Sequence, residues 1–399
     1  MFHRKYRGVT CVLALAGTLG WGVFPVHADD QSNVRKVFVI AMENHNWTQP
    51  ASVTSPQQIS GNPAAPFINS LVNGTSGFSD QVAYATNYIN AGINLGLHVH
   101  PSEPNYVWAE AGQAFNSIGT DDDPYFPGPT PPACTPDTVT TSGLHLTAFL
   151  ANAHKTWRAY QEDVNVNLTD NVPLPMGSWT FPLFSHSGNF PSGLNTYNYS
   201  TQYNYASKHN PMIFFRDTNG GCPAAASTLY PPLQQLALDL QNGNVADYNW
   251  ITPNQYNDQH SALNGGYGVF TPASDQSSIA QGDNFLARIV PLIMASDAYQ
   301  AGGMIVLWWD ESEGGDTFEE KLPFIIISKD AHNNVGGKPY ASSVQFSHSS
   351  FLRTMQEIFR VDPSNGYQWL GDAANANDLS DLFQPDAILS DLFKRDSIR

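Results

Sequence analysis

The segment KVFVIAMEN, residues 36–44, carries the most information about the fold. After Lys36 it is apolar and rich in β-branched side chains, and it ends abruptly at Glu43 and Asn44. An unbroken apolar strand of this kind is typical of a parallel sheet that is covered on both faces. The segment therefore predicts a buried strand over residues 36–42, with polar side chains directly after its carboxyl end.

The same pattern recurs along the chain. Three more apolar runs lead into polar residues: 248–251 into Thr252-Pro253-Asn254, 303–309 into Asp310-Glu311, and 324–327 into Ser328-Lys329-Asp330. Helical spacing of apolar residues predicts helices over 144–160, over 278–296, and from Ser347 or His348 to Phe359. Strands that alternate with helices predict an α/β fold, a three-layer sandwich with a mostly parallel central sheet. Long loop insertions over 120–136 and 165–205 are expected to wall a cleft.

The first 28 residues predict a secretory signal peptide. Arg4, Lys5 and Arg7 are followed by an uncharged apolar run from Val9 to Phe24, and small residues precede the expected cleavage site after Ala28. The alternative is an uncleaved membrane anchor, which the shortness of the run and its glycines disfavour. We therefore predict a secreted or periplasmic protein without stable membrane insertion, and one domain with insertions over 29–399.

Charge narrows the range of partners. The chain carries 35 acidic and 18 basic residues, a formal net charge of −17. Loss of the signal peptide would remove three basic residues and no acid, which leaves about −20. A surface of this sign repels polynucleotides, so no nucleic-acid partner is expected. The sequence carries no indication of an oligomeric state.

Two cysteines, Cys134 and Cys222, remain beyond the signal peptide. In an oxidising compartment they predict one disulfide, and two unpaired thiols are the alternative. Neither has a second Cys or His at chelating distance along the chain, so a thiolate metal site is not expected.

Acidic and amide side chains are expected to meet at one edge of the sheet, because functional groups gather at the carboxyl ends of parallel strands. Glu43 and Asn44 follow one strand, and Asp310 and Glu311 follow another. Several oxygen ligands without a thiolate describe a site for a hard divalent cation, or a borderline one if histidine joins. The alternative is that they are ordinary solvated strand ends.

Serine and histidine supply further candidates. Ser102 lies between Pro101 and Pro104, which predicts a stiff loop able to hold a nucleophile in place. Asp258 and His260 alternate, so both side chains point the same way in an extended chain. His98, His100, His209 and His348 are further candidates, of which His348 is expected at a helix start.

Together these segments resemble the phosphoesterase family that contains acid phosphatases and phosphatidylcholine-type phospholipases C, a branch of the alkaline-phosphatase-like superfamily. The segments that carry the resemblance cover nearly all of the chain beyond residue 28: VFVIAMEN (37–44), HPSEPNYVWAEAG (100–112), TWRAYQED (156–163), KHNPMIFF (208–215), NWITPNQYNDQHS (249–261), IVLWWDESEGGD (305–316), LPFIIIS (322–328), FSHSSFLRTMQEIF (346–359) and LGDAANANDLSDLF (370–383).

The resemblance implies a metal-dependent hydrolase with an alkaline-phosphatase-like fold and a phosphoserine intermediate. The metal ligands it implies are Glu43, Asn44, Ser102, Asp310 and Glu311. The catalytic residues it implies are Ser102, as nucleophile, with His260 and His348, and the substrate contacts are Asn105, His209 and Asp258. The cofactor is a divalent ion (Ca, Mg, Mn or Zn), with a second metal expected at Asp258, His260 and His348. The partner is a small-molecule phosphate ester.

Two departures from the family pattern bear on the substrate. His45-Asn46 follows Glu43-Asn44, where phospholipase-type members carry an Arg-Ser-like pair, and 314–317 reads Gly-Gly-Asp-Thr where they tend to have Asp-His. Both favour phosphate monoester hydrolysis of the acid phosphatase type. A phospholipase C that cuts phospholipid diesters is the alternative enzyme, and a non-catalytic periplasmic binding protein is the alternative from another class.

Overall fold

The computed structural model describes residues 34–51, 53–92, 99–115, 117, 119–122, 124, 138–167, 170, 172–180, 204–221, 226–313, 321–334, 336–385 and 387. All of these belong to one compact unit, residues 32–399. The expected signal peptide, Cys134 and Cys222 lie outside the described residues, so cleavage, export and the disulfide stay predictions. No helix in the described ranges combines the length and the apolar character that crossing a bilayer requires.

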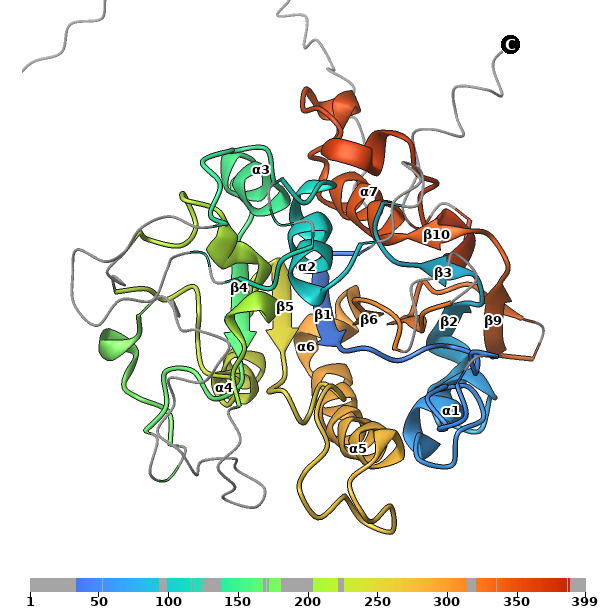
Figure 1. Cartoon of the computed structure of the whole chain (residues 1–399). Coiled ribbons are helices and arrows are strands. Elements are labelled where there is room, and N and C mark those ends of the chain that lie inside the picture. The colour runs from blue at the N-terminus through green and yellow to red at the C-terminus, as the bar shows by residue number, and fades with distance from the viewer. Residues whose placement is uncertain are drawn as a thin grey trace, which may run out of the picture. The chain divides into compact units, whose positions relative to one another are not determined.

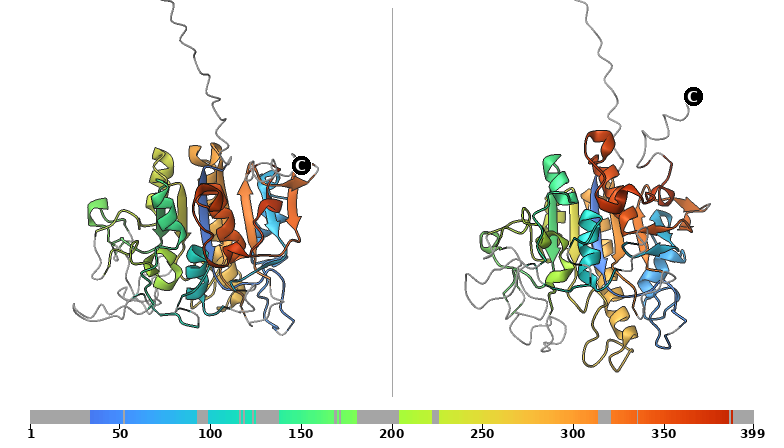
Figure 2. Two further views of the ribbon diagram at one scale, coloured as in Figure 1. Left: turned by 90° about the horizontal axis from the view of Figure 1, so that it is seen from above. Right: turned by 45° about the horizontal axis from the view of Figure 1, so that its top comes forward.

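Eight strands of the described chain form one sheet in the order β4-β5-β1-β6-β7-β2-β9-β8, and β10 pairs with β3 separately. The strands are β1 Lys36–Met42, β2 Val82–Ala85, β3 Tyr88–Ile89, β4 Trp157–Gln161, β5 Tyr248–Thr252, β6 Gly303–Trp309, β7 Phe324–Ser328, β8 Asn333–Asn334, β9 Lys338–Ser342 and β10 Phe346–Ser347. β4, β5, β1 and β6 run parallel to one another, and Figure 2 shows β5, β1 and β6 side by side in yellow, blue and orange.

Helices cover both faces of the sheet, as Figure 1 shows, with α2, α3 and α7 on one face and α1, α4 and α5 on the other. The helices are α1 Pro66–Val72, α2 Ser102–Ala111, α3 Leu146–Asn152, α4 Gln235–Asn242, α5 Asp275–Met294, α6 Asp297–Gln300 and α7 His348–Phe359. This arrangement confirms the predicted three-layer α/β sandwich. It also explains the unbroken apolar strands, because β1 and β6 are buried on both sides.

Four predicted strands are confirmed as β1, β5, β6 and β7. One predicted helix, over 144–160, is wrong in its second half. α3 ends at Asn152, His154 takes a left-handed φ of 57°, and the chain then forms β4, which pairs with β5. Pairing with a neighbouring strand overrode the helical spacing of the sequence, and that neighbour is 91 residues away along the chain.

The direction of β7 corrects a second expectation. β7 runs antiparallel to β6, with Met304 opposite Ser328. The polar residues that follow β7, from Ser328 to Asp330, therefore lie at the edge of the sheet where β6 begins. Of the four predicted strands, β1, β5 and β6 have their carboxyl ends at the opposite edge, where they build the site.

Candidate active site

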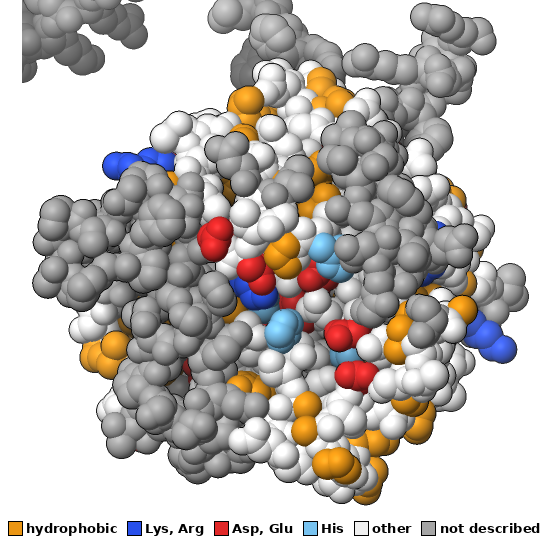
Figure 3. Space-filling model, in the orientation of Figure 1, with side chains coloured by type: hydrophobic (Ala, Val, Ile, Leu, Met, Phe, Trp, Pro, Cys, Tyr) orange, Lys and Arg blue, Asp and Glu red, His pale blue; other side chains and the backbone are white. Residues whose placement is uncertain are grey.

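The ends of the parallel strands bring together the polar residues that follow them. Met42 and Trp309 are register partners, so Glu43 and Asp310 begin side by side, and the Asp310 amide donates to the Met42 carbonyl at 3.3 Å. The Glu43 amide donates to the carbonyl of Asp258 at 2.8 Å, which joins the segment after β5 to the same edge. Figure 3 shows acidic, histidine and basic side chains gathered at the centre of this face.

We call Glu43, Asn44, Asp310 and Glu311 the oxygen-ligand cluster. Asn44 holds it together: the backbone N–H donates to Asp310 Oδ1 at 3.3 Å, and the side-chain amide donates to Glu311 Oε1 at 2.8 Å. Asn44 has a φ of 31°, a left-handed conformation that asparagine tolerates better than most residues. The predicted ligand residues are therefore adjacent in space, although 267 residues separate Asn44 from Glu311.

Ser102 faces this cluster. Its hydroxyl lies 3.0 Å from Glu311 Oε1 and 3.2 Å from Glu43 Oε2, and the side chain is buried. The sequence predicted a stiff loop here, but Ser102 is the first residue of α2. Pro101 and Pro104 fit this position, because proline is tolerated before a helix and in its first turn. The N-terminus of a helix also favours an anion such as phosphate.

The far end of α2 is fixed as well. Gly112 ends the helix with a φ of 65°, and a side chain at this position would lie 2.2 Å from the Leu370 carbonyl oxygen. Trp108 Nε1 donates to Ser349 Oγ on α7 at 2.9 Å. Backbone packing and a buried hydrogen bond therefore determine where α2 places Ser102.

Further residues surround Glu43 and Glu311. Asn105, a predicted substrate contact, donates from Nδ2 to Glu311 Oε2 at 3.1 Å, and His100 Nδ1 lies 2.8 Å from the same oxygen. The Tyr106 hydroxyl donates to Glu43 Oε1 at 2.5 Å. Sequence reasoning missed Tyr106, yet a helix starting at Ser102 puts residues three and four positions later on the same face.

His209 joins Glu43 to Asp258. Its Nε2 lies 3.0 Å from Glu43 Oε1, and its Nδ1 lies 3.4 Å from Asp258 Oδ2. The ring stacks on Tyr106 with 5.1 Å between centroids. One atom from each of Glu43, His209 and Asp258 lies within 4.8 Å of the other two, so these residues form a group that can hold a metal ion. Glu43 thus belongs both to this group and to the oxygen-ligand cluster.

This group differs from the predicted second metal site of Asp258, His260 and His348. Among the described residues, neither His260 nor His348 joins such a group. Asp258 accepts from the backbone N–H of His260 at 2.8 Å, whereas the His260 ring lies 3.0 Å from Ser261 Oγ. The carboxylate therefore fixes the backbone of His260 instead of orienting its ring.

His348 is buried behind the cluster. Its Nε2 donates to the Asp310 carbonyl at 2.6 Å, and its Nδ1 lies 3.1 Å from Trp308 Nε1 and 2.9 Å from the Tyr88 hydroxyl. Burial lowers the pKa of His348 to about 3, so the ring stays neutral. Both ring nitrogens therefore have partners within the protein, one of them the backbone carbonyl of Asp310, and the catalytic role of His348 stays a prediction.

Burial and mutual repulsion raise the pKa values of the clustered acids. For Glu43 the causes are burial and then the charges of Asp310 and Asp258. For Asp310 they are burial and the charge of Glu311. A divalent cation would relieve this repulsion. The residues fit such an ion, because Asn44 Oδ1 and Asp310 Oδ2 are buried acceptors that have no hydrogen-bond partner among the described residues.

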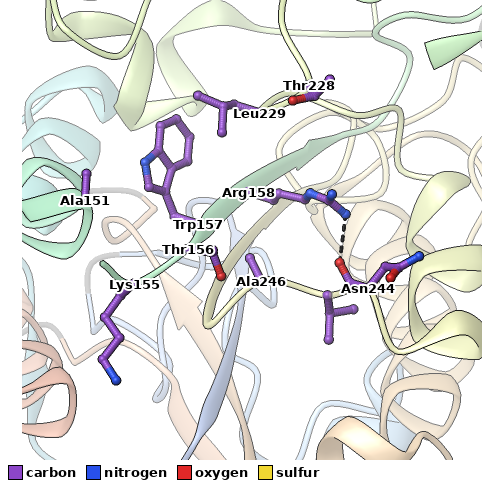
Figure 4. A pocket seen from close by; sticks show the side chains of 10 residues that line it. Ala151, Lys155, Thr156, Trp157, Arg158, Thr228, Leu229, Asn244 and Ala246 are labelled. Carbon is purple, nitrogen blue, oxygen red and sulfur yellow. Dashed lines mark hydrogen bonds between the residues drawn. The ribbon is translucent and has the colours of Figure 1, made fainter. Parts of the chain in front are cut away.

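A separate pocket of about 430 Å³ lies at the opposite edge of the sheet, around the start of β4. Figure 4 shows Trp157 and Arg158 on its wall, with the Arg158 guanidinium bound to the Asn244 carbonyl. The same guanidinium pairs with Asp239 at 2.5 Å. The charge of Arg158 is therefore already neutralised, and the pocket lies at the other edge of the sheet from the oxygen-ligand cluster.

The chain is similar to several known proteins. The phosphatidylinositol-3-phosphatase of Mycobacterium tuberculosis is 24% identical over 389 residues, which cover 95% of each chain. The phosphate-repressible acid phosphatase of Penicillium chrysogenum is 22% identical over 219 residues, 55% of this chain and 39% of its own. The phosphonate monoester hydrolase of Agrobacterium radiobacter aligns over 82% of this chain and 74% of its own, with a TM-score of 0.40 and 10% identity. The model of the Phosphoesterase family matches residues 25–362, and the chain therefore belongs to that family and is a phosphoric ester hydrolase.

Proposed function

We propose that this chain hydrolyses phosphate monoesters through Ser102. In each turnover the serine is phosphorylated by the substrate, and water then hydrolyses the phosphoserine. One observation carries the proposal. The Ser102 hydroxyl, at the N-terminus of α2, lies within 3.2 Å of the carboxylates of both Glu43 and Glu311. Two buried carboxylates at one hydroxyl cost free energy unless their charges are compensated, and this supports a functional role for the arrangement.

A divalent cation bound by the oxygen-ligand cluster would lower the pKa of the Ser102 hydroxyl and neutralise part of the phosphate charge. Ser102 gives its proton to a neighbouring carboxylate, and Oγ attacks phosphorus while the ester P–O bond breaks. Asn105 and His209 lie beside the same carboxylates and provide N–H donors for the phosphoryl oxygens. A water molecule then hydrolyses the phosphoserine and restores Ser102.

His260 is the second catalytic residue in this proposal. Burial and then the charge of Lys208 lower its pKa to about 4. It therefore acts as a neutral imidazole that donates a hydrogen bond to the leaving oxygen, which takes its proton from solvent.

The ligand chemistry supports particular metals. The oxygen-ligand cluster suits Ca²⁺, Mg²⁺ or Mn²⁺, since its donors are carboxylate and amide oxygens. The Glu43–His209–Asp258 group adds an imidazole nitrogen, which suits Zn²⁺ or Mn²⁺. We propose that the first of these sites is the one required for activation of Ser102.

The names of the relatives support a substrate class for this proposal. The mycobacterial relative, which matches 95% of this chain, is named for removal of a phosphate monoester from a lipid. This favours a lipid phosphomonoester as a second candidate substrate, beside small soluble monoesters. Phospholipase C activity requires a diester, so comparison of phosphatidylcholine with phosphatidylinositol 3-phosphate separates the two.

The nucleophile is tested by Ser102→Ala. We expect hydrolysis of p-nitrophenyl phosphate to fall by about a thousandfold or more, as for other enzymes that lose a nucleophile. The midpoint of urea unfolding should stay within the error of wild type. Quenched reactions of the wild type should also contain a phosphoserine at residue 102, located by mass spectrometry. Near-normal turnover by Ser102→Ala would exclude this serine as nucleophile, and phosphate binding without any wild-type turnover would favour a binding protein.

A further inference from the structure

Lys208 is a buried cation beside the candidate active site. It belongs to the short helix Ser207–His209, and its side chain is 7% exposed. Nζ donates to Asp121 Oδ2 at 2.5 Å. Lysine is rarely buried to this extent unless it is paired, because the ammonium loses its hydration, and here Asp121 is the partner.

Asp121 connects this lysine to the helix that carries Ser102. Its Oδ1 accepts from the backbone N–H of Glu103 at 3.3 Å, while its Oδ2 binds Lys208. Glu103 directly follows Ser102 in the first turn of α2. One carboxylate therefore fixes the ammonium group relative to the N-terminus of the helix and to the Ser102 backbone.

The other neighbour of Lys208 belongs to the site as well. His209 follows it in the chain, lies 3.0 Å from Glu43, and is held through its carbonyl by Thr252 Oγ1 at 3.0 Å. Lys208 also interacts electrostatically with the acids of the site. Burial raises the pKa values of Glu43 and Asp258, and the positive charge of Lys208 lowers the pKa of each. The ammonium group is thus fixed between α2 and the ends of β1 and β5.

We propose that Lys208 binds a non-bridging oxygen of the substrate phosphoryl group, that Asp121 positions it, and that this cation sets the preference for monoesters over diesters. The inference rests on the proposed function. A monoester is a dianion near neutral pH, whereas a diester is a monoanion, so a fixed positive charge stabilises the monoester more. A phosphoryl oxygen would share the ammonium protons with Asp121, since Lys offers three donors.

The alternative is that Lys208 is only a counter-ion that keeps the acidic site folded. The two roles differ in what their loss does. A counter-ion affects metal content and stability, and its removal lowers turnover of every ester alike. A phosphoryl-binding cation affects phosphate affinity and changes the ratio of monoester to diester hydrolysis.

The test compares Lys208→Met with wild type, both loaded with metal. We expect kcat/KM for p-nitrophenyl phosphate to fall about 10- to 100-fold, the effect of losing a hydrogen bond to a charged group. The inhibition constant of inorganic phosphate should rise by a similar factor. The kcat/KM for bis(p-nitrophenyl) phosphate should change less than about threefold. Lys208→Arg should recover most of the monoester activity.

Lys36→Met provides the matched control. Lys36 pairs with Asp247 at 2.9 Å in an ion pair at the opposite edge of the sheet. Its removal should leave both ester activities and phosphate inhibition unchanged.

Asp121→Asn provides a second test. It keeps the ammonium group of Lys208 but removes the carboxylate that positions it, and we expect a raised KM for the monoester with a smaller change in kcat. This variant tests the proposal even if Lys208→Met fails to fold.

Two results would overturn the inference. Equal losses for monoester and diester with unchanged phosphate inhibition would make Lys208 a counter-ion. Unchanged KM and phosphate inhibition in Asp121→Asn would remove the positioning role of Asp121. Failure of the proposed function is distinguishable, because the wild type would then not hydrolyse the phosphate monoester. Calorimetric titration of wild type and Lys208→Met with inorganic phosphate would still show whether this lysine binds the anion.

Discussion

Glu43 and Ser102 are 59 residues apart in the chain, and their side-chain oxygens meet at 3.2 Å. Glu43 directly follows a central parallel strand, whereas Ser102 begins a helix on one face of the sheet. Glu43 also accepts from Tyr106 and contacts His209 through its other oxygen, so one carboxylate touches both candidate cation sites. Changes around Glu43 should therefore affect metal binding and catalysis together.

Asp310→Asn tests the oxygen-ligand cluster. Asp310 Oδ2 is buried without a hydrogen-bond partner among the described residues, and the substitution removes the charge that would hold a cation there. We expect metal affinity to fall at least about 10-fold and monoester turnover to fall with it. Metal analysis after dialysis and a metal titration of activity measure both effects. The exposed Asp297→Asn on α6 serves as control, and full metal content with normal activity in Asp310→Asn would contradict the assignment.

Tyr106→Phe tests the support of Glu43. The change removes the donor that lies 2.5 Å from Glu43 Oε1 and leaves the stacking on His209 in place. We expect about 10- to 100-fold weaker metal binding, as for other residues that orient a ligand. The measurement is activity against free metal concentration. If saturating metal does not restore most of the turnover, Tyr106 acts on the substrate and not on the metal ligand.

His348 and His260 should respond differently to replacement. His348→Ala leaves the Asp310 carbonyl and Trp308 Nε1 without their buried partner, so we expect the free energy of unfolding to fall by about 1–3 kcal/mol. His260→Ala removes a more exposed ring and should lower kcat with a much smaller loss of stability. Urea unfolding and steady-state kinetics of both variants check this contrast. Equal stability losses would refute the separation of structural and catalytic histidines.

Asp283, which lies away from the candidate active site, is expected to make the free energy of unfolding depend on pH. Its carboxylate accepts from the backbone N–H groups of Phe67 and Ile68 at 3.0 and 2.8 Å, yet burial raises its pKa to about 6. A raised carboxyl pKa means that the folded state binds the proton more tightly than the unfolded chain. The stabilisation is complete below the unfolded pKa of about 4 and is lost as pH rises through about 6, by roughly 3 kcal/mol at most.

Asp283→Asn should remove this dependence. We expect the difference in the free energy of unfolding between wild type and variant to change by roughly 2–3 kcal/mol between pH 4 and pH 7, with wild type losing stability as pH rises. Urea unfolding at a series of pH values measures it. Parallel curves for the two proteins would show that Asp283 titrates normally.

Much of the fold could be predicted from local patterns. The strands β1, β5, β6 and β7 were predicted because each is a short apolar run with a polar end. The short strands β2 and β9 were missed, since β2 has only four residues and only two of the five residues of β9 are buried. The error over residues 144–160 has the same origin, because β4 exists only where β5 offers it hydrogen bonds.

The same distinction between local patterns and tertiary contacts applies to the residues of the candidate site. Periodicity and strand ends indicated Glu43, Asn44, Asp310 and Glu311, since parallel strands present their carboxyl ends at one edge. The roles of the histidines could not be predicted in this way. His209, His260 and His348 differ in function because of the atoms around their rings, which come from segments distant in the chain.

The sequence by itself determined that this chain folds as a layered α/β protein with acids at the strand ends, because hydrophobic periodicity and strand termini are local properties of neighbouring residues. Only the tertiary structure decided that Ser102 opens a helix toward two carboxylates, that Tyr106 binds Glu43, and that His348 is buried behind Asp310. The physical reason is that hydrogen bonding and burial depend on distances between segments, and these distances arise only when the chain is packed.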